Sequence, residues 1–167
     1  MRVIGIDPGT LNLGFGILDE DNGCIVPIKF GVISISSKLK IENRLNSIYC
    51  QLCDVFNINK PDEVAIEEPF VASNVKSAFA IGRSQAIAIL VAAQRNLPIF
   101  YYFPATIKQQ ISSYGGSTKY QVGEMVKIHL GLGGSIIPED AADSLAVANC
   151  HINHRHINNL IKKETSQ

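Results

Sequence analysis

The chain has 167 residues, of which 46% are hydrophobic, and its 15 basic and 15 acidic residues give a net charge of zero. This length and composition predict one domain with a substantial core and exclude a second large lobe. The longest apolar stretch, Ala86–Ala93, is far shorter than the roughly 20 residues that span a bilayer. Because the N-terminus begins in a strand pattern without a signal segment, we expect a soluble, cytoplasmic protein.

The charges are distributed unevenly along the chain. Residues 1–70 carry six basic and ten acidic groups, residues 71–135 carry six and one, and residues 136–167 carry three and four. The middle segment therefore has a net charge of +5, which favours contact with phosphates, whereas the acidic flanks favour cations. An ordinary solvated face would give the same pattern, and this alternative stays open.

The first part of the chain predicts a three-stranded antiparallel meander. Residues 2–7 and 11–18 have the apolar pattern of strands, and the pair Asn22-Gly23 is a strong hairpin signal. We therefore expect residues 24–36 to return as a third strand. Apolar residues at helical spacing then predict an amphipathic helix over 41–56.

A short buried strand, Glu63–Glu67, follows this helix, and a helical crossover favours parallel pairing with residues 2–7. Further elements predicted are a largely buried helix capped by Ser73 or Asn74 and running to about Arg95, a strand over 97–103, helices over 104–112 and 119–130, and a last helix from near Pro138. The expected fold is one α/β domain over residues 1–152, with a five-stranded mixed sheet flanked by helices.

Residues 153–167 are expected to form a C-terminal tail that is disordered or contacts DNA loosely. The cysteines have neither the spacing of a disulfide framework nor that of a zinc site, and Cys50 and Cys53 read as small apolar residues of a helix. His151, His154 and His156 are expected to lie in the solvated tail, although adventitious metal binding is an alternative.

Two acidic residues share an unusual position. Asp7 and Glu67 each directly follow a buried apolar strand, and an ionised carboxylate there needs a cation or strong donors. If the two strands are parallel neighbours, both carboxylates emerge at the end of the sheet where α/β proteins bind ligands. Two alternatives stay open: Asp7 accepting hydrogen bonds from its own turn, and Glu68 replacing Glu67.

Asp140 and Asp143 complete a candidate metal site. Their i, i+3 spacing puts both on one helix face, and the alanines between them allow close packing against the sheet. Four carboxylates without His or Cys suit Mg²⁺ or Mn²⁺ rather than Zn²⁺. Two such ions about 4 Å apart can activate a water and stabilise the leaving oxygen of a phosphodiester. Alone, Asp140 reads equally well as an acid that interacts with the helix dipole, and Asp143 as a surface residue.

Together these motifs resemble those of the RuvC-type Holliday-junction resolvases, over about residues 2–152. The resemblance rests on Gly5-Ile-Asp7-Pro-Gly9 with Gly14-Phe-Gly16, then Ala65-Ile-Glu67 followed by Phe70 and Asn74, then Asp140-Ala-Ala-Asp143-Ser-Leu-Ala. It implies a ribonuclease H-like fold, a symmetric homodimer, and Mg²⁺-dependent paired nicking of four-way DNA junctions with 5′-phosphate and 3′-hydroxyl ends. It also implies cooperation with a branch-migration complex of the RuvA and RuvB type.

The resemblance further assigns roles to individual residues. Asp7, Glu67, Asp140 and Asp143 would bind one or two Mg²⁺ per subunit, with Mn²⁺ as a substitute. Lys108 and Lys119 would support catalysis and hold the scissile backbone. Phe70 would stack on a base at the junction centre, although a core position is its alternative. The remaining expected DNA contacts are Asn74, Lys76 and Arg83.

Three other functions compete with junction resolution. Another ribonuclease H-like nuclease would share the acids but cut a different nucleic acid. An actin-like ATPase or sugar kinase has a phosphate loop similar to Asp7-Pro-Gly-Thr10, but it needs two lobes around the nucleotide. A non-catalytic junction-binding protein would gain nothing from four repulsive carboxylates near phosphates.

Overall fold

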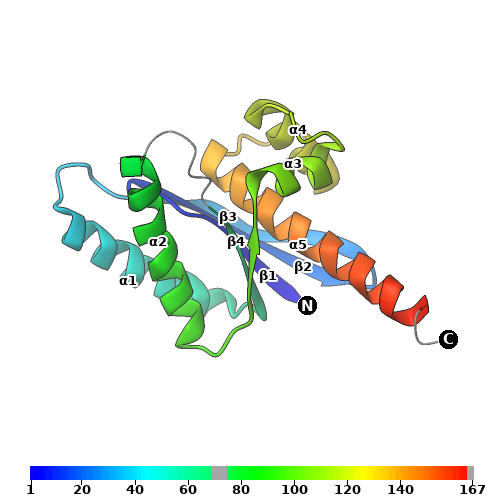
Figure 1. The fold of residues 1–167 in the computed structure, drawn as a ribbon, viewed down its shortest axis with the longest axis horizontal. Coiled ribbons are helices and arrows are strands. Elements are labelled where there is room, and N and C mark those ends of the chain that lie inside the picture. Colours follow the sequence, from blue (N-terminus) through cyan, green and yellow to red (C-terminus); the bar gives the residue numbers. More distant parts are fainter. Residues whose placement is uncertain (69–74, 165–167) are drawn as a thin grey trace.

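A five-stranded mixed sheet forms the centre of the molecule in a computed structural model that describes residues 1–68 and 75–164 (Figure 1). The strand order is β3-β2-β1-β4-β5. The first three strands pair antiparallel, and β4 and β5 continue the sheet in parallel with β1. The strands are β1 (Arg2–Asp7), β2 (Asn12–Asp21), β3 (Cys24–Ser34), β4 (Glu63–Glu67) and β5 (Ile99–Tyr102). The predicted fold class is therefore confirmed.

Helices cover both faces of this sheet. The helices α1 and α2 contact each other and share one apolar core with the sheet, and α3, α4 and α5 share the other core (Figure 1). Alternate residues of β1 divide between the two cores, as the pleat of a strand requires: Ile4 and Ile6 on one side, Val3 on the other. The helices are α1 (Ile41–Asn59), α2 (Val75–Ala93), α3 (Pro104–Ser112), α4 (Lys119–His129) and α5 (Glu139–Glu164).

Three glycines on β1 and β2 allow α5 to lie unusually close to the sheet. A Cβ atom at Gly5 would lie 2.6 Å from the backbone nitrogen of Ala148, and one at Gly16 would lie 2.8 Å from that of Leu145. A Cβ at Gly14 would overlap the carbonyl oxygen of Asp140. No real side chain tolerates such contacts, so these glycines set the distance between α5 and the strands.

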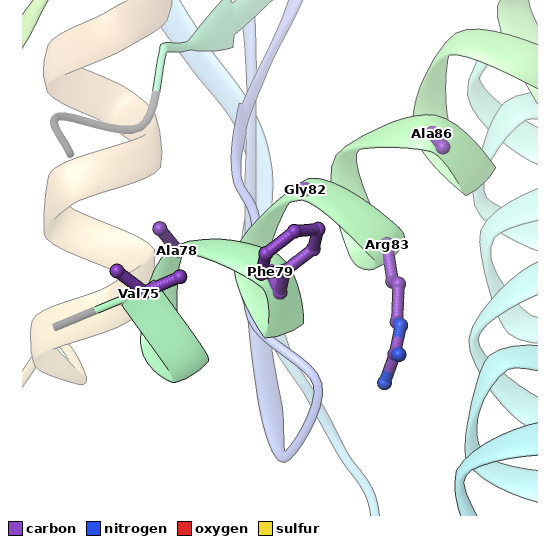
Figure 2. A pocket seen from close by; sticks show the side chains of 6 residues that line it. All are labelled: Val75, Ala78, Phe79, Gly82, Arg83 and Ala86. Atoms are coloured by element: carbon purple, nitrogen blue, oxygen red, sulfur yellow. The ribbon is translucent and has the colours of Figure 1, made fainter.

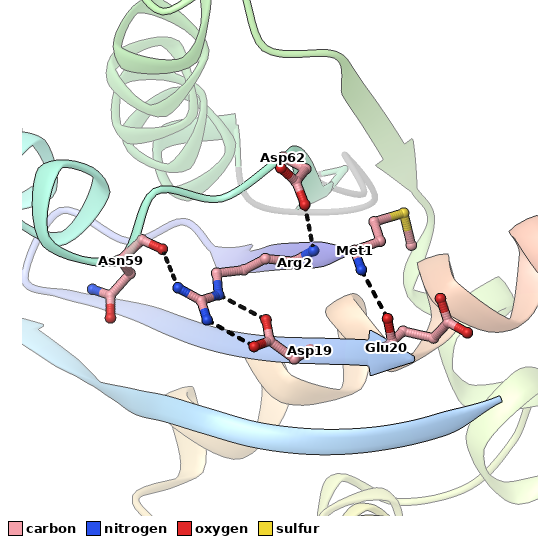
Figure 3. A network of polar contacts seen from close by, with 6 residues as sticks. All are labelled: Met1, Arg2, Asp19, Glu20, Asn59 and Asp62. Atoms are coloured by element: carbon pink, nitrogen blue, oxygen red, sulfur yellow. Dashed lines mark hydrogen bonds and ion pairs between the residues drawn. The ribbon is translucent and has the colours of Figure 1, made fainter. Parts of the chain in front are cut away.

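The N-terminal end of β1 is fixed by a polar network (Figure 3). The Arg2 guanidinium donates two hydrogen bonds of 2.7 Å to Asp19 on β2 and one of 2.6 Å to the Asn59 carbonyl. The Arg2 backbone N–H donates to Asp62 at 2.6 Å, and the N-terminal ammonium donates to the Glu20 carbonyl. The end of β1 opposite Asp7 is thereby held to β2 and to the segment between α1 and β4.

The C-terminal helix differs from the prediction. We expected a tail from residue 153, but α5 continues without a break to Glu164. His151 does not lie in a solvated tail: its side chain is fully buried. The His151 ring accepts a hydrogen bond from the Tyr102 hydroxyl at 2.7 Å and contacts Glu63 at 2.7 Å. The sequence after residue 152 did not predict this part of the helix, because few of its residues are buried and most of them are polar.

The helix α2 is less buried than its composition predicted. Its buried residues cluster in the second half, whereas Val75 and Phe79 near its start are exposed. By length and mean hydropathy, 1.3, α2 alone among the described helices could cross a membrane. However, α2 packs on α1, and its buried Ser84 donates a hydrogen bond of 2.9 Å to the Gly9 carbonyl. These contacts make α2 part of the folded domain.

Candidate active site

The predicted acidic residues come from three elements that meet at one end of the sheet. Asp7 ends β1 and Glu67 ends β4, and the parallel register pairs the residues just before them, Ile6 and Ile66. The first turns of α5 supply Asp140 and Asp143. Gly14 stands opposite Asp7 on β2 and allows the backbone of Asp140 to approach.

The pKa values of two of these acids reflect this convergence. Burial, followed by the charges of Glu67, Asp143 and Asp140, raises the pKa of Asp7 to about 8 against the opposing charge of Lys119. Burial, followed by the charge of Asp143, raises the pKa of Glu67 to about 7. For both carboxyls, burial and the neighbouring acids outweigh the positive charge of Lys119, and a cation bound beside them would favour their ionised forms.

Lys119 is a cationic side chain in direct contact with this group. Its ammonium donates a hydrogen bond of 2.7 Å to Asp143 and lies 3.6 Å from a carboxylate oxygen of Glu139. Partial burial would lower its pKa, but the hydrogen bond to Asp143 and the surrounding acidic charges outweigh burial and raise it. Lys119 is positioned by the start of α4, where Thr118 and Gln121 form a capping box.

A cleft of about 230 Å³ lies beside these groups. Its polar lining consists of Glu67, Asp143, Lys108 and Lys119, and its apolar lining comes from α3, α4 and α5. Two carboxylates and two ammonium groups therefore face one concave space at the end of the sheet. Such a space can hold a phosphate on the cations next to a metal on the carboxylates.

The donor set fits a hard divalent cation. All four predicted ligands are carboxylates, two of them are largely buried, and their mutual repulsion disfavours ionisation without added positive charge. Within residues 1–68 and 75–164, no three His, Cys, Asp or Glu side chains already form a group that could hold an ion. One carboxylate oxygen of Asp143, Oδ2, accepts the hydrogen bond from Lys119.

Two of the remaining predicted DNA contacts, Lys76 and Arg83, do not line this cleft. Lys76 and Arg83 are exposed on α2, and Arg83 lies beside the exposed Phe79 (Figure 2). Phe70 and Asn74 lie outside the described residues. The prediction that they contact DNA therefore stays a prediction.

Sequence reasoning missed three residues next to the acidic group. Glu139 contacts Lys119, and Ser84 and Gln85 on α2 bond to the chain after β1 and at the end of β4. Gln85 donates to the Glu67 carbonyl at 3.4 Å. A signal was present, because Ser84 and Gln85 are polar residues that directly precede the apolar run Ala86–Ala93.

Known proteins match this chain over nearly its whole length. The model of the family described as crossover junction endodeoxyribonuclease RuvC matches residues 3–151. The crossover junction endodeoxyribonuclease RuvC of Dehalococcoides mccartyi strain BAV1 is 44% identical over 163 residues, which cover 98% of both chains. That of Caldicellulosiruptor saccharolyticus is 46% identical over 153 residues, covering 91% of this chain and 92% of the relative.

Solved structures agree with these matches. Thermus thermophilus RuvC, in a complex with a Holliday junction substrate, superposes with a TM-score of 0.87 at 28% identity and covers 95% of this chain and 96% of its own. The yeast mitochondrial Holliday junction resolvase Ydc2 shares the fold, with a TM-score of 0.66 at 15% identity over 96% of this chain and 85% of its own. The resemblance predicted from the sequence is confirmed, and the chain belongs to the crossover junction endodeoxyribonuclease RuvC family.

Proposed function

We propose that this protein resolves four-way DNA junctions by metal-dependent hydrolysis of one phosphodiester in each of two opposed strands. The observation that carries this proposal is the meeting of Glu67 and Asp143 with Lys108 and Lys119 around one cleft, in a chain of this family. Asp7 lies close enough for the charges of Glu67 and Asp143 to raise its pKa. The Thermus relative was captured on a Holliday junction, which supports the same substrate here.

The four carboxylates Asp7, Glu67, Asp140 and Asp143 would hold one or two Mg²⁺, or Mn²⁺ in their place. When bound, the metal would lower the pKa of a water and stabilise the charge on the leaving 3′ oxygen. The ammonium groups of Lys108 and Lys119 would hold the scissile phosphate by its non-bridging oxygens. The attacking water adds to phosphorus and the 3′ oxygen leaves, which gives 5′-phosphate and 3′-hydroxyl ends.

Paired nicks require two active sites, so we propose a homodimer. The exposed apolar part of α2 is the candidate interface: Val75, Ala78, Phe79 and Ala86 line a shallow pocket of about 450 Å³ there (Figure 2). Solvent contact with these side chains is unfavourable, which supports a protein partner on this face. We further propose that the protein acts in the cytoplasm with a branch-migration complex of the RuvA and RuvB type.

The proposal is tested with a labelled four-way junction and Mg²⁺. We expect symmetric nicks in opposed strands, and no cleavage after addition of EDTA. Four variants should bind the junction but not cut it: Asp7→Asn, Glu67→Gln, Asp140→Asn and Asp143→Asn. Cleavage by any two of them would show that the metal site is wrongly assigned. A preference for linear duplex or an RNA–DNA hybrid would identify another ribonuclease H-like nuclease.

A further inference from the structure

A second groove lies along α3 and α4. Tyr114 and Tyr120 line it, together with Ser112, Ser117 and Glu124, and its volume is about 470 Å³. A neighbouring depression is lined by Lys119 and Asp143, which also line the cleft, and by Tyr120 and Glu124 from the groove. The groove and the cleft are therefore parts of one continuous surface, and none of the roles proposed above uses the groove.

Two tyrosines of this groove are strongly exposed. Tyr114 is 70% exposed and Tyr120 is 77% exposed, although each has a large apolar ring. The ring of Tyr114 lies against Gly116, where an added Cβ would come within 2.7 Å of the ring. Because Gly116 has no side chain, the Tyr114 ring packs directly on the backbone there. The outer side of that ring is open to a ligand.

The loop that carries Tyr114 is held by hydroxyl groups. Ser112 Oγ donates a hydrogen bond of 2.7 Å to Ser117 Oγ, and Ser117 Oγ lies 2.8 Å from the carbonyl of Tyr114. Ser117 is buried, and the capping box of Thr118 begins α4 directly after it. The loop is ordered before any ligand arrives, so binding by its tyrosine carries little additional cost in conformational entropy.

Two lysines and three acids line the depression between the groove and the cleft, and each of these acids is paired with one of the lysines. Lys119 precedes Tyr120 in the chain, and the acid in the groove, Glu124, is paired with Lys127 at 2.8 Å. Exposed aromatic rings beside ammonium groups are the combination that binds single nucleic-acid strands, because rings stack on bases and cations hold phosphates. A protein partner would instead require a broader apolar patch than two separate rings.

We propose that Tyr114 and Tyr120 bind the DNA strand being cut, by stacking on a base that is unpaired close to the scissile phosphate. This inference rests on the proposed function, since the strand runs from the catalytic cleft into the groove. It assigns the tyrosines to substrate binding, whereas the four acids and two lysines act at the phosphate.

The chain contains no tryptophan, so a single tryptophan can report on the groove. The variant Tyr120→Trp is titrated with a four-way junction in EDTA, where no strand is cut. We expect its fluorescence to fall by about half or more on binding, since a stacked base quenches indole emission. The matched control is Val26→Trp, an exposed position on β3 that pairs with Asp19 at the opposite end of the sheet. Its emission should not change.

Substitutions then separate stacking from hydrogen bonding. Tyr114→Ala and Tyr120→Ala should each weaken junction binding by about 5- to 100-fold, the range for loss of one stacked base. Tyr114→Phe and Tyr120→Phe keep the ring and should bind as the wild type does. Circular dichroism of each variant checks that α4 is retained.

Several outcomes would overturn the inference. The first is unchanged emission from Tyr120→Trp on a junction that the wild-type protein cuts. The second is that the alanine variants bind and cut like the wild type. The third is that the phenylalanine variants bind the junction as weakly as the alanine variants. The first two would leave the proposed function intact. If the wild-type protein cut no junction but a single strand quenched Tyr120→Trp, the proposed substrate would be wrong and the groove would still bind a strand.

Discussion

At the residue scale, Asp7 and Glu67 make the folded protein sensitive to pH. Their pKa values in the fold, about 8 and about 7, lie well above the ordinary values of 3.8 and 4.5. The folded state therefore holds these two protons more tightly than the unfolded state does. These carboxyls disfavour folding increasingly as the pH rises from about 4 through 8, unless a cation compensates them.

The variant Asp7→Asn should be inactive but more stable than the wild type when no divalent cation is present. It removes a buried negative charge from beside Glu67 and Asp143. Removing about 1 kcal/mol of repulsion should raise the Tm by roughly 2–4 °C in a domain of this size. The gain should be larger at pH 8.5 than at pH 5, where Asp7 is protonated in the fold.

The measurement is thermal unfolding in EDTA at both pH values. Asp54→Asn, which changes an exposed acid on α1, serves as the control and should leave the Tm unchanged. A Tm for Asp7→Asn below that of the wild type at pH 8.5 would contradict the buried repulsion.

Mg²⁺ should stabilise the wild-type protein, because an ion bound by the folded state alone raises the free energy of unfolding. Since protons compete with the ion for Asp7 and Glu67, the increase in Tm should be larger at pH 8 than at pH 6. Calorimetry in about 10 mM Mg²⁺, a concentration chosen to exceed the dissociation constants of weak carboxylate sites, measures this effect. If Mg²⁺ raised the Tm of Asp7→Asn by the same amount, the ion would bind at a site that does not include Asp7.

At the element scale, the contact between α5 and the strands β1 and β2 positions half of the acidic group. The acids themselves were predictable from the sequence, because each follows or begins an element whose pattern is clear. The crossover from β1 to β4 also predicted the parallel neighbours that bring Asp7 and Glu67 together. The full length of α5 and the exposed start of α2 were not predictable, since both depend on what packs against a helix rather than on its own pattern.

The polar side chains near the acids also could not be predicted, since their positions depend on what packs against them. Ser84 and Gln85 are buried because the chain after β1 and the end of β4 offer carbonyl groups to them. No periodicity within α2 could have identified those acceptors, because they lie far away in the sequence. Likewise, His151 is buried because Glu63 and Tyr102 bind it from two strands.

Gly14→Ala should abolish cleavage in a protein that still folds. The added Cβ would overlap the Asp140 carbonyl, so the start of α5 must move away from Asp7. Displacements of about 1 Å cost on the order of 100-fold in rate. Gly123→Ala on α4 is the matched control, since its Cβ would meet only Ala142 at 3.9 Å.

A steady-state cleavage assay and circular dichroism measure the two glycine variants side by side. The control should keep its activity and become slightly more stable, by about 0.5–1 kcal/mol, because alanine favours a helix. Wild-type activity in Gly14→Ala would mean that α5 can shift without disturbing the acids.

At the scale of the whole molecule, a buried polar cluster ties α5 to the strands β4 and β5. The Tyr102 hydroxyl donates to His151 Nδ1, so His151 Nε2 donates to Glu63, which also pairs with Arg155. This arrangement suits a neutral imidazole. Burial, and secondly the neighbouring His154, lowers the pKa of His151 to about 4.

The neutral His151 should make the protein lose stability in mild acid. Below the ordinary pKa of 6.5 the unfolded chain binds a proton that the folded ring does not. Stability should therefore fall as the pH decreases from about 6.5 to about 4. His151→Gln should lower the Tm at pH 7, since loss of a buried hydrogen bond costs about 1–3 kcal/mol, and should flatten the dependence on pH.

The measurement is the Tm at pH 7 and pH 5 for the wild type and His151→Gln. His129→Gln, which replaces an exposed histidine at the end of α4, is the control and should keep the wild-type dependence on pH. An unchanged pH dependence in His151→Gln would assign the acid sensitivity to other groups.

The glycine contacts between the strands and α5 have a consequence for how the protein tolerates change. Where main chain touches main chain, the separation is fixed by atoms that every amino acid has in common. Substitutions elsewhere in the two apolar cores can repack without altering the spacing between Asp140 and the end of β1. The four proposed metal ligands are thus protected from substitutions in the core, whereas substitution of Gly5, Gly14 or Gly16 would push α5 away from the strands.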